Sequence, residues 1–125
     1  MKKILIVDDE TNFLLSLADM LKVSNNNFSV ETAGNGIEAS KIIDSGGIDL
    51  VVTDLNMPVM NGLELLKALR ELPVTKRTPV LMLTTETKDE LKQQGKALGL
   101  TGWIVKPFNP TQLKSAITRV LRLPA

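Results

Sequence analysis

Charged side chains follow several apolar segments of this sequence at the point where each segment ends. Asp8 and Asp9 follow the first segment, and Asp54 follows the third. Lys106 follows the fifth segment. Carboxylate oxygens are the ligands that hard divalent cations such as Mg²⁺ prefer. An aspartate is also ionised at neutral pH, since its reference pKa is about 3.9, so it can act as a nucleophile without a base. These residue types predict metal binding or nucleophilic chemistry.

Two residue types are missing, which excludes much other chemistry. The 125 residues include no histidine and no cysteine. Histidine-based triads, histidine metal ligands, disulfides and thiol nucleophiles are therefore absent. Fifteen Lys and Arg against fourteen Asp and Glu give a net charge of +1, so we expect neither nucleic acid nor a membrane surface as a partner.

The apolar segments are too short for membrane insertion or secretion. The longest aliphatic runs have four residues, whereas a membrane span needs roughly 20. The apolar stretch after the first three residues ends at Asp8, which is too early for a signal peptide. We therefore expect a cytoplasmic protein.

Five apolar segments alternate with five segments of helical periodicity. The expected strands are residues 3–7, 28–33, 49–53, 80–84 and 102–105. The expected helices are residues 11–22, 36–45, 62–72, 88–98 and 109–121. Short aliphatic strands without polar alternation indicate a parallel sheet buried on both faces by helices. Right-handed crossovers then predict a doubly wound α/β fold with five parallel strands and five helices. The length predicts one domain over residues 1–125.

The charged residues should meet at one edge of this sheet. Ligands of open parallel sheets bind beyond the carboxyl ends of the strands, and neighbouring strands lie about 4.8 Å apart. If the first and third strands are neighbours, Asp8, Asp9 and Asp54 crowd together. Two like charges 4 Å apart repel by about 4 kcal/mol at an effective dielectric of 20, so the three acids need a cation, for which Mg²⁺ is suited. Lys106 adds a further positive charge.

These residues stand in a pattern that resembles the receiver domain of two-component response regulators. The resemblance covers nearly the whole chain, and residues 61–67 and 79–82 are most similar to its stand-alone chemotaxis members. The motifs are Asp8-Asp9, Asp54-Leu55-Asn56-Met57-Pro58, Gly62, Thr84 and Lys106-Pro107-Phe108. The resemblance implies the flavodoxin-like strand order 2-1-3-4-5 and a cis peptide bond before Pro107.

The resemblance also implies a role for each side chain of the acid cluster. Asp54 is the expected phosphoryl acceptor. Asp9 is expected to bind Mg²⁺ directly and Asp8 largely through water, with Asp54 and the Asn56 carbonyl completing the protein ligands. Lys106 is expected to act with Asp54 by contacting the transferred phosphoryl oxygens.

Other residues are expected to switch or tune the phosphorylated state. Thr84 is the expected switch hydroxyl and a further phosphoryl contact, although periodicity alone does not choose between it and Thr85. Trp103 is the expected aromatic switch residue, at the place where the family has a Tyr or Phe whose rotamer follows the switch hydroxyl. Because Trp is larger, we expect its inward swing to be restricted. Asn56, Thr85 and Glu86 are the expected tuning residues.

The fourth expected helix should be the weakest and the part that moves. Segment 88–98 has few apolar residues and carries Gly95 in its middle. A glycine inside a helix costs about 1 kcal/mol relative to alanine. A helix with few apolar contacts belongs to the least stable part of a fold.

The resemblance implies a single-domain regulator that receives a phosphoryl group from a histidine kinase or phosphotransfer domain. It would catalyse only its own phosphorylation and dephosphorylation, and it would signal through phosphorylation-dependent protein contacts. Chemotaxis, with a flagellar motor switch component as target, ranks before a phosphorelay shuttle or phosphate sink. The alternative is the receiver fragment of a longer transcriptional regulator. A Mg²⁺-dependent aspartyl phosphatase ranks last, because such enzymes keep an acid where this chain has Asn56. We expect a monomer, with a phosphorylation-linked dimer as the other possibility.

Overall fold

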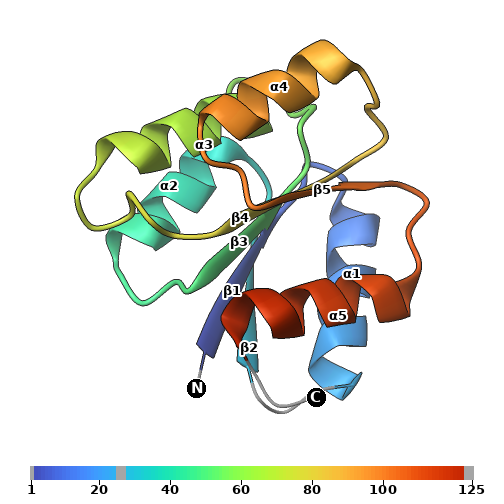
Figure 1. The fold of residues 1–125 in the computed structure, drawn as a ribbon. Helices are drawn as coiled ribbons and strands as arrows, with labels where there is room; N and C mark the ends of the chain where they lie inside the picture. Colours follow the sequence, from blue (N-terminus) through green and yellow to red (C-terminus); the bar gives the residue numbers. More distant parts are fainter. Residues whose placement is uncertain (1, 25–27, 123–125) are drawn as a thin grey trace.

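Strands and helices alternate five times in the computed structural model, which describes residues 2–24 and 28–122 (Figure 1). The strands are β1 (Lys2–Val7), β2 (Phe28–Ala33), β3 (Leu50–Thr53), β4 (Val80–Thr84) and β5 (Gly102–Val105). The helices are α1 (Thr11–Ser24), α2 (Gly36–Asp44), α3 (Gly62–Glu71), α4 (Asp89–Ala97) and α5 (Pro110–Leu121). The strands pair in parallel in the order β2-β1-β3-β4-β5, which confirms the expected fold class and strand order. Residues 1, 25–27 and 123–125 of the expected domain lie outside the described residues.

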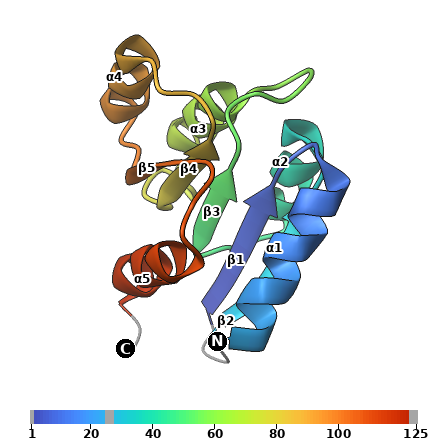
Figure 2. The ribbon, with the colours of Figure 1, turned by 90° about the vertical axis from the view of Figure 1, so that its right-hand side faces the viewer.

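The helices cover both faces of the sheet. Helices α1 and α5 lie on one side, and α2, α3 and α4 lie on the other (Figures 1 and 2). Each side has its own apolar core, with Leu17 and Ile117 in the first and Leu65 and Leu66 in the second. Within the described residues, no helix is long and apolar enough to cross a membrane.

Burial differs between the central and the edge strands. Strands β3 and β4 are buried along their whole length, as expected for a sheet covered on both faces. In β2 only Phe28, Val30 and Ala33 are buried, and none of the four residues of β5, all of them described, is fully buried. The expectation of uniformly buried strands is therefore wrong at the two edges, because an edge strand has a neighbouring strand on one side alone.

Helix α4 is held by few apolar contacts. Of its nine residues, all of which the structure describes, Gly95 alone is buried. A Cβ atom at Gly95 would lie 2.9 Å from Cδ2 of Leu100, so the glycine allows the helix to approach the chain before β5. The sparse anchoring expected for this helix is confirmed.

The carboxyl end of α4 is fixed by one side chain of α3. The guanidinium of Arg70 donates from Nε to the Leu98 carbonyl at 3.0 Å and from Nη2 to the Gly99 carbonyl at 3.0 Å. Its Nη1 donates to the carbonyls of Thr75 at 3.3 Å and Thr78 at 2.8 Å. Desolvation by burial lowers the pKa of Arg70 from its ordinary value. The group stays charged at neutral pH, because the ordinary pKa of arginine lies far above neutrality.

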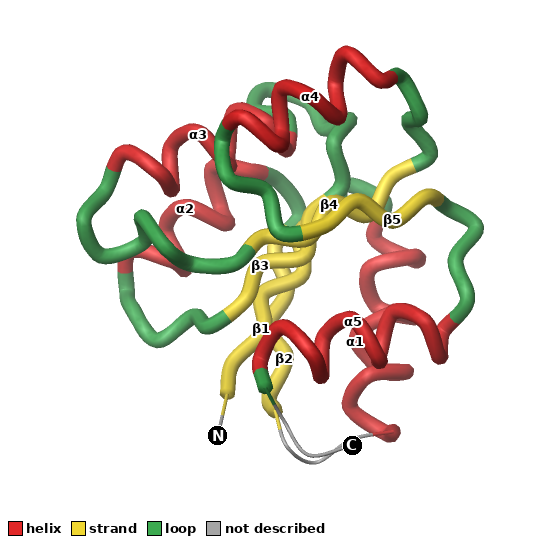
Figure 3. The backbone as a smooth tube through the Cα atoms, in the orientation of Figure 1, coloured by secondary structure: helices red, strands yellow, loops and turns green. Residues whose placement is uncertain are grey.

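All five strands run in the same direction, so the loops that follow them lie at one edge of the sheet (Figure 3). This edge carries the charged residues considered next.

Candidate functional site

The register of the sheet places the acidic residues side by side. Val7 pairs with Thr53 across β1 and β3, so Asp8 and Asp54, the next residues along each strand, are neighbours. The backbone N–H of Asp54 donates to the Val7 carbonyl at 3.0 Å, which extends this pairing to the start of the loop. The predicted meeting of the first and third strand ends is therefore confirmed.

Three carboxylates form a cluster at this edge. Asp8, Asp9 and Asp54 each offer one oxygen, and these oxygens all lie within 4.8 Å of one another. Asp8 is buried, Asp54 is partly buried and Asp9 is exposed. Hard oxygen ligands with three negative charges fit a divalent cation such as Mg²⁺, which keeps several water ligands on its open side.

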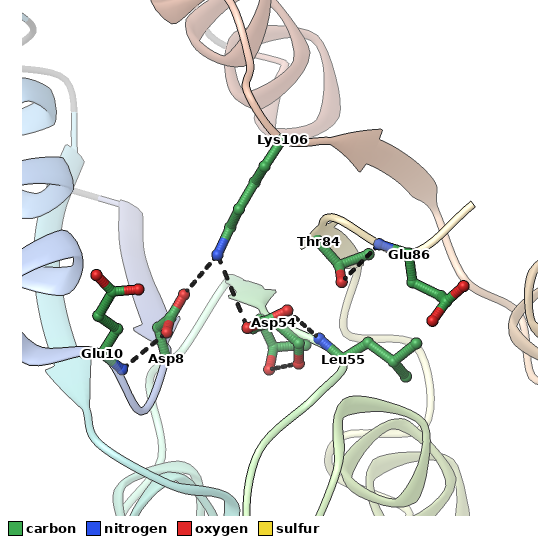
Figure 4. A network of polar contacts seen from close by, with 8 residues as sticks. Asp8, Glu10, Asp54, Leu55, Thr84, Glu86 and Lys106 are labelled. Carbon is green, nitrogen blue, oxygen red and sulfur yellow. Dashed lines mark hydrogen bonds and ion pairs between the residues drawn. The ribbon is translucent and has the colours of Figure 1, made fainter. Parts of the chain in front are cut away.

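Lys106 provides the positive charge expected beside these acids. Its Nζ lies 2.9 Å from Oδ2 of Asp8 and 3.7 Å from Oδ2 of Asp54 (Figure 4). The side chains of Lys106 and Asp8 are 16% and 4% exposed. This ion pair is therefore shielded from water, unlike the surface pairs that contribute little to stability.

The second oxygen of each paired carboxylate accepts a backbone hydrogen bond. Oδ1 of Asp8 accepts from the N–H of Glu10 at 2.9 Å, and Oδ1 of Asp54 accepts from the N–H of Leu55 at 2.7 Å (Figure 4). These bonds fix the planes of both carboxylates and leave Oδ2 of each facing Lys106.

An aromatic ring also contacts the lysine, a contact that the sequence pattern does not indicate. Nζ of Lys106 lies 4.1 Å from the centroid of the Phe13 ring. The rings of Phe13 and Phe108 meet edge to face, with centroids 6.1 Å apart and planes at 89°. In the sequence, Phe13 belongs to the apolar pattern of segment 11–22, which predicts only a core position. Its one further signal is that it lies four residues after Asp9, near the start of the helix that follows the acid pair.

Thr84 is buried at the end of β4, on the far side of Asp54 from Asp8 in the strand order. Its Oγ1 accepts a hydrogen bond from the N–H of Glu86 at 3.2 Å (Figure 4). The N–H of Lys106 donates to the Thr84 carbonyl at 2.8 Å, so the backbone links the expected switch hydroxyl to the expected lysine.

The expected tuning residues lie in the loops that follow β3 and β4. Asn56 and Thr85 are exposed, and Glu86 is partly buried. Asn56 borders a groove of about 300 Å³ between α3 and α4. Oε1 of Glu86 accepts from the N–H groups of Thr87 and Lys88 at 3.2 and 3.3 Å, so this carboxylate caps its own loop.

Trp103 contacts the loop that contains Glu86. Its side chain is partly buried against the core on the α2, α3 and α4 side, and its Nε1 donates to the Glu86 carbonyl at 2.9 Å. The restricted swing expected for this ring stays a prediction.

Two backbone features shape the loops of the site. The Lys106-Pro107 peptide bond is cis, as the resemblance implied. Gly62, the first residue of α3, lies so close to the acceptor loop that an added Cβ would overlap the Asp54 carbonyl oxygen. Its N–H donates to the Leu55 carbonyl at 2.8 Å.

Comparison with known proteins gives concordant matches over almost the whole chain. The profile of the family described as response regulator receiver domain matches residues 4–118. Chemotaxis protein CheY-3 of Vibrio cholerae is 38% identical over 118 residues, which cover 94% of this chain and 90% of that protein. Transcriptional regulatory protein CpxR of Escherichia coli is 38% identical over 122 residues, which cover 98% of this chain and 50% of that protein. Among solved structures, chemotaxis protein CheY4 of Vibrio cholerae has a TM-score of 0.88 and 46% identity, covering 96% of this chain and 98% of its own.

Proposed function

The chain belongs to the response regulator receiver family, and we propose that Asp54 accepts a phosphoryl group from a histidine kinase or a phosphotransfer domain. The observation that carries this proposal is the position of Asp54. One of its oxygens lies within 4.8 Å of those of Asp8 and Asp9, and its Oδ2 lies 3.7 Å from the Lys106 ammonium.

The proposed reaction is an in-line transfer between a phosphohistidine and the Asp54 carboxylate. A carboxylate oxygen of Asp54 forms the new bond to phosphorus while the bond from phosphorus to the imidazole nitrogen breaks. The nitrogen keeps the electron pair of the broken bond and leaves as neutral imidazole, because the other ring nitrogen of the phosphohistidine carries a proton. No base on this chain is needed, since the carboxylate nucleophile has no proton to lose. Phosphoryl transfer depends chiefly on positioning and electrostatic stabilisation, which fixed carboxylates and an ammonium group provide.

Receiver domains bind Mg²⁺ in an acidic pocket, and this chain has the residues to do so. Asp8, Asp9, Asp54 and the Asn56 carbonyl would hold the ion. When bound, Mg²⁺ supplies positive charge against the phosphoryl oxygens.

Lys106 and Thr84 would bind the phosphoryl oxygens from the protein side. The Lys106 ammonium already lies between two acids and has donors left for a third partner. The Thr84 hydroxyl oxygen accepts from Glu86, so its own O–H remains free to donate to a phosphoryl oxygen. Once Asp54 is phosphorylated, Thr84 would thereby pull the β4–α4 loop toward the phosphoryl group.

For the output, we propose phosphorylation-dependent contacts with a target protein in the cytoplasm, most directly a flagellar motor switch component. The similarity to two chemotaxis proteins supports this target. The chain spans half of CpxR, so the receiver part of a longer transcriptional regulator is the second candidate. A phosphorelay shuttle or phosphate sink would use the same Asp54 chemistry. The proposed activity is limited to the protein's own phosphorylation and dephosphorylation. The proposed oligomeric state is a monomer, with a phosphorylation-linked dimer as the alternative.

Intact-mass measurement tests the proposed acceptor. With Mg²⁺ and a small phosphodonor, we expect a gain of one phosphoryl group, which Asp54→Asn or metal removal abolishes. Asp44→Asn, at the exposed end of α2, is the matched control and should be phosphorylated normally. A product that forms equally on Asp54→Asn would contradict the proposal.

An absent product needs a second measurement, because rapid hydrolysis also leaves no product. Beryllofluoride mimics the phosphoryl group and cannot be hydrolysed away. Trp103 is the sole tryptophan and lies beside the β4–α4 loop, so its fluorescence should report the titration. A response that needs Asp54 supports rapid turnover, and no response overturns the proposed acceptor.

A further inference from the structure

We propose that Phe13 is a positioning residue for Lys106, and that the face of its ring holds the lysine ammonium at the acceptor site through a cation–π contact. The inference rests on the proposed function of Asp54 and adds a residue from outside the charged cluster. The contact itself is direct, because Nζ lies 4.1 Å from the ring centroid. Cation–π attraction is significant within about 6 Å of the centroid.

The ammonium of Lys106 is held by unlike partners. It lies 2.9 Å from Oδ2 of Asp8 and 3.7 Å from Oδ2 of Asp54, in addition to its contact with the ring. The ring attracts the cation through its electron-rich face but offers no lone pair that would compete with a carboxylate for an N–H. The lysine therefore gains a third support while its remaining donors stay available to the phosphoryl oxygens.

The surroundings make this contact stronger than one on an open surface. The Lys106 side chain is 16% exposed, so little water competes for its ammonium. Phe13 itself is partly buried against the core between the sheet and helices α1 and α5. Cation–π attraction is about twice as large or more when the pair is desolvated than when it is exposed.

The orientation of the Phe13 ring is fixed from a second direction. Phe108 packs edge to face against it at 6.1 Å and 89°. Phe108 follows Lys106-Pro107, so the segment that carries the lysine also carries the ring that braces Phe13. An aliphatic residue at position 13 would fill similar space, but it would lack the attraction for the cation.

The consequence concerns how often the lysine is in place. A lysine stem has several rotatable bonds, and an ammonium without support samples water-facing rotamers. By restricting these rotamers, the ring increases the fraction of molecules in which Lys106 lies beside Asp54. Removal of the ring's electron density should slow phosphorylation of Asp54 about threefold to tenfold.

The first test reads the geometry without any phosphorylation. Protons on Cε of Lys106 lie near the face of the ring, so NMR should show them shifted upfield relative to those of an exposed lysine such as Lys67. Phe13→Leu should remove this shift and Phe13→Tyr should retain it, with Lys67 unchanged in both variants. An absent shift in the native protein, or one that survives Phe13→Leu, overturns the inference whatever the acceptor does.

The second test separates ring electrostatics from packing. Phenylalanine analogues with one, two or three fluorines at position 13 weaken the ring's attraction for a cation with little change in shape. The phosphorylation rate with a small phosphodonor and Mg²⁺ should fall step by step along this series. The same analogues at Phe28, buried at the start of β2, are the matched control and should leave the rate unchanged.

The two tests fail in distinguishable ways. A rate that does not depend on fluorination at position 13 overturns the positioning role even where Asp54 is phosphorylated. A native protein that shows the lysine shift but gains no phosphoryl group and no beryllofluoride response overturns the proposed function instead.

Discussion

The indole N–H of Trp103 donates a 2.9 Å hydrogen bond to the backbone carbonyl of Glu86, 17 residues earlier in the chain. Glu86 also donates its own N–H to the hydroxyl of Thr84. One short loop is therefore tied to β5 on one side and to the expected switch hydroxyl on the other. A phenylalanine at position 103 would leave the Glu86 carbonyl without this donor.

Trp103→Phe should loosen the β4–α4 loop and leave the acceptor chemistry intact. The lost hydrogen bond corresponds to about 1 kcal/mol, or roughly a fivefold rise in local opening. Amide hydrogen exchange over residues 85–88 should accelerate by about this factor, while the phosphorylation rate of Asp54 stays within about twofold of native. A phosphorylation rate as low as that of a Lys106 variant would show that the indole acts on the acceptor itself.

Gly62→Ala should both destabilise the protein and impair phosphorylation. The added Cβ would overlap the Asp54 carbonyl oxygen and lie 2.8 Å from Sδ of Met82. Because the backbone cannot yield as a side-chain end can, the free energy of unfolding should fall by about 2 kcal/mol or more. Gly34→Ala is the matched control, since its nearest contact would be an ordinary 3.6 Å from Glu38. Equal stability of the two variants in urea unfolding would contradict this account.

Asp9→Asn should raise the stability of the metal-free protein and reduce its response to Mg²⁺. The substitution removes one of three clustered negative charges, so repulsion among the acids falls. It also replaces a charged carboxylate ligand with a neutral amide oxygen, so Mg²⁺ affinity should fall by about tenfold or more. A ligand at 100 times its Kd stabilises a protein by about 2.7 kcal/mol, so thermal unfolding with and without Mg²⁺ measures both effects. An unchanged Mg²⁺ response would remove Asp9 from the metal site.

Arg70→Lys should destabilise the fold despite keeping the charge. A lysine cannot reproduce the planar set of donors that serves four backbone carbonyls of two segments. We expect the free energy of unfolding to fall by about 2 kcal/mol, and hydrogen exchange over residues 98–101 to accelerate. Arg77→Lys, at an exposed position of the α3–β4 loop, should change neither. A stable Arg70→Lys variant would mean that these carbonyls are satisfied by water.

The sequence was sufficient to predict what depends on the order of elements. The acid cluster follows from the positions of the strand ends. Residues that directly follow neighbouring parallel strands are adjacent because of the backbone register, whatever the direction of their side chains. Asp8 and Asp54 are adjacent for this reason alone. The strand order itself was implied by the family resemblance, because the pattern of short apolar segments does not determine which strands are neighbours.

Contacts that depend on side-chain direction were not predictable in this way. Arg70 has the spacing of a solvated helix residue, yet two of its acceptors lie 28 and 29 residues later in the chain. Phe13 has the spacing of a core residue, and its ring face contacts Lys106 only because the lysine side chain extends from the end of β5 to Asp8 at the end of β1, where α1 follows. Gly95 disfavours a helix by its propensity, but it leaves room for the Leu100 side chain, which an added Cβ would approach to 2.9 Å.

The unequal ends of α4 give this helix the properties of a lever. The side chain of Lys88 makes no capping hydrogen bond at the amino end, where the Lys88 N–H donates to Oε1 of Glu86 in the β4–α4 loop at 3.3 Å, whereas Arg70 fixes the chain just past the carboxyl end to α3. Nine residues at 1.5 Å each make an arm of about 13 Å, so a rotation of about 10° about the Arg70 pivot carries the free end through about 2 Å. The free end adjoins the loop that Thr84 and Trp103 hold. A small displacement at the acceptor site therefore acts on the amino end of α4, which moves furthest. The result is a change in the angle of the helix about the Arg70 contacts.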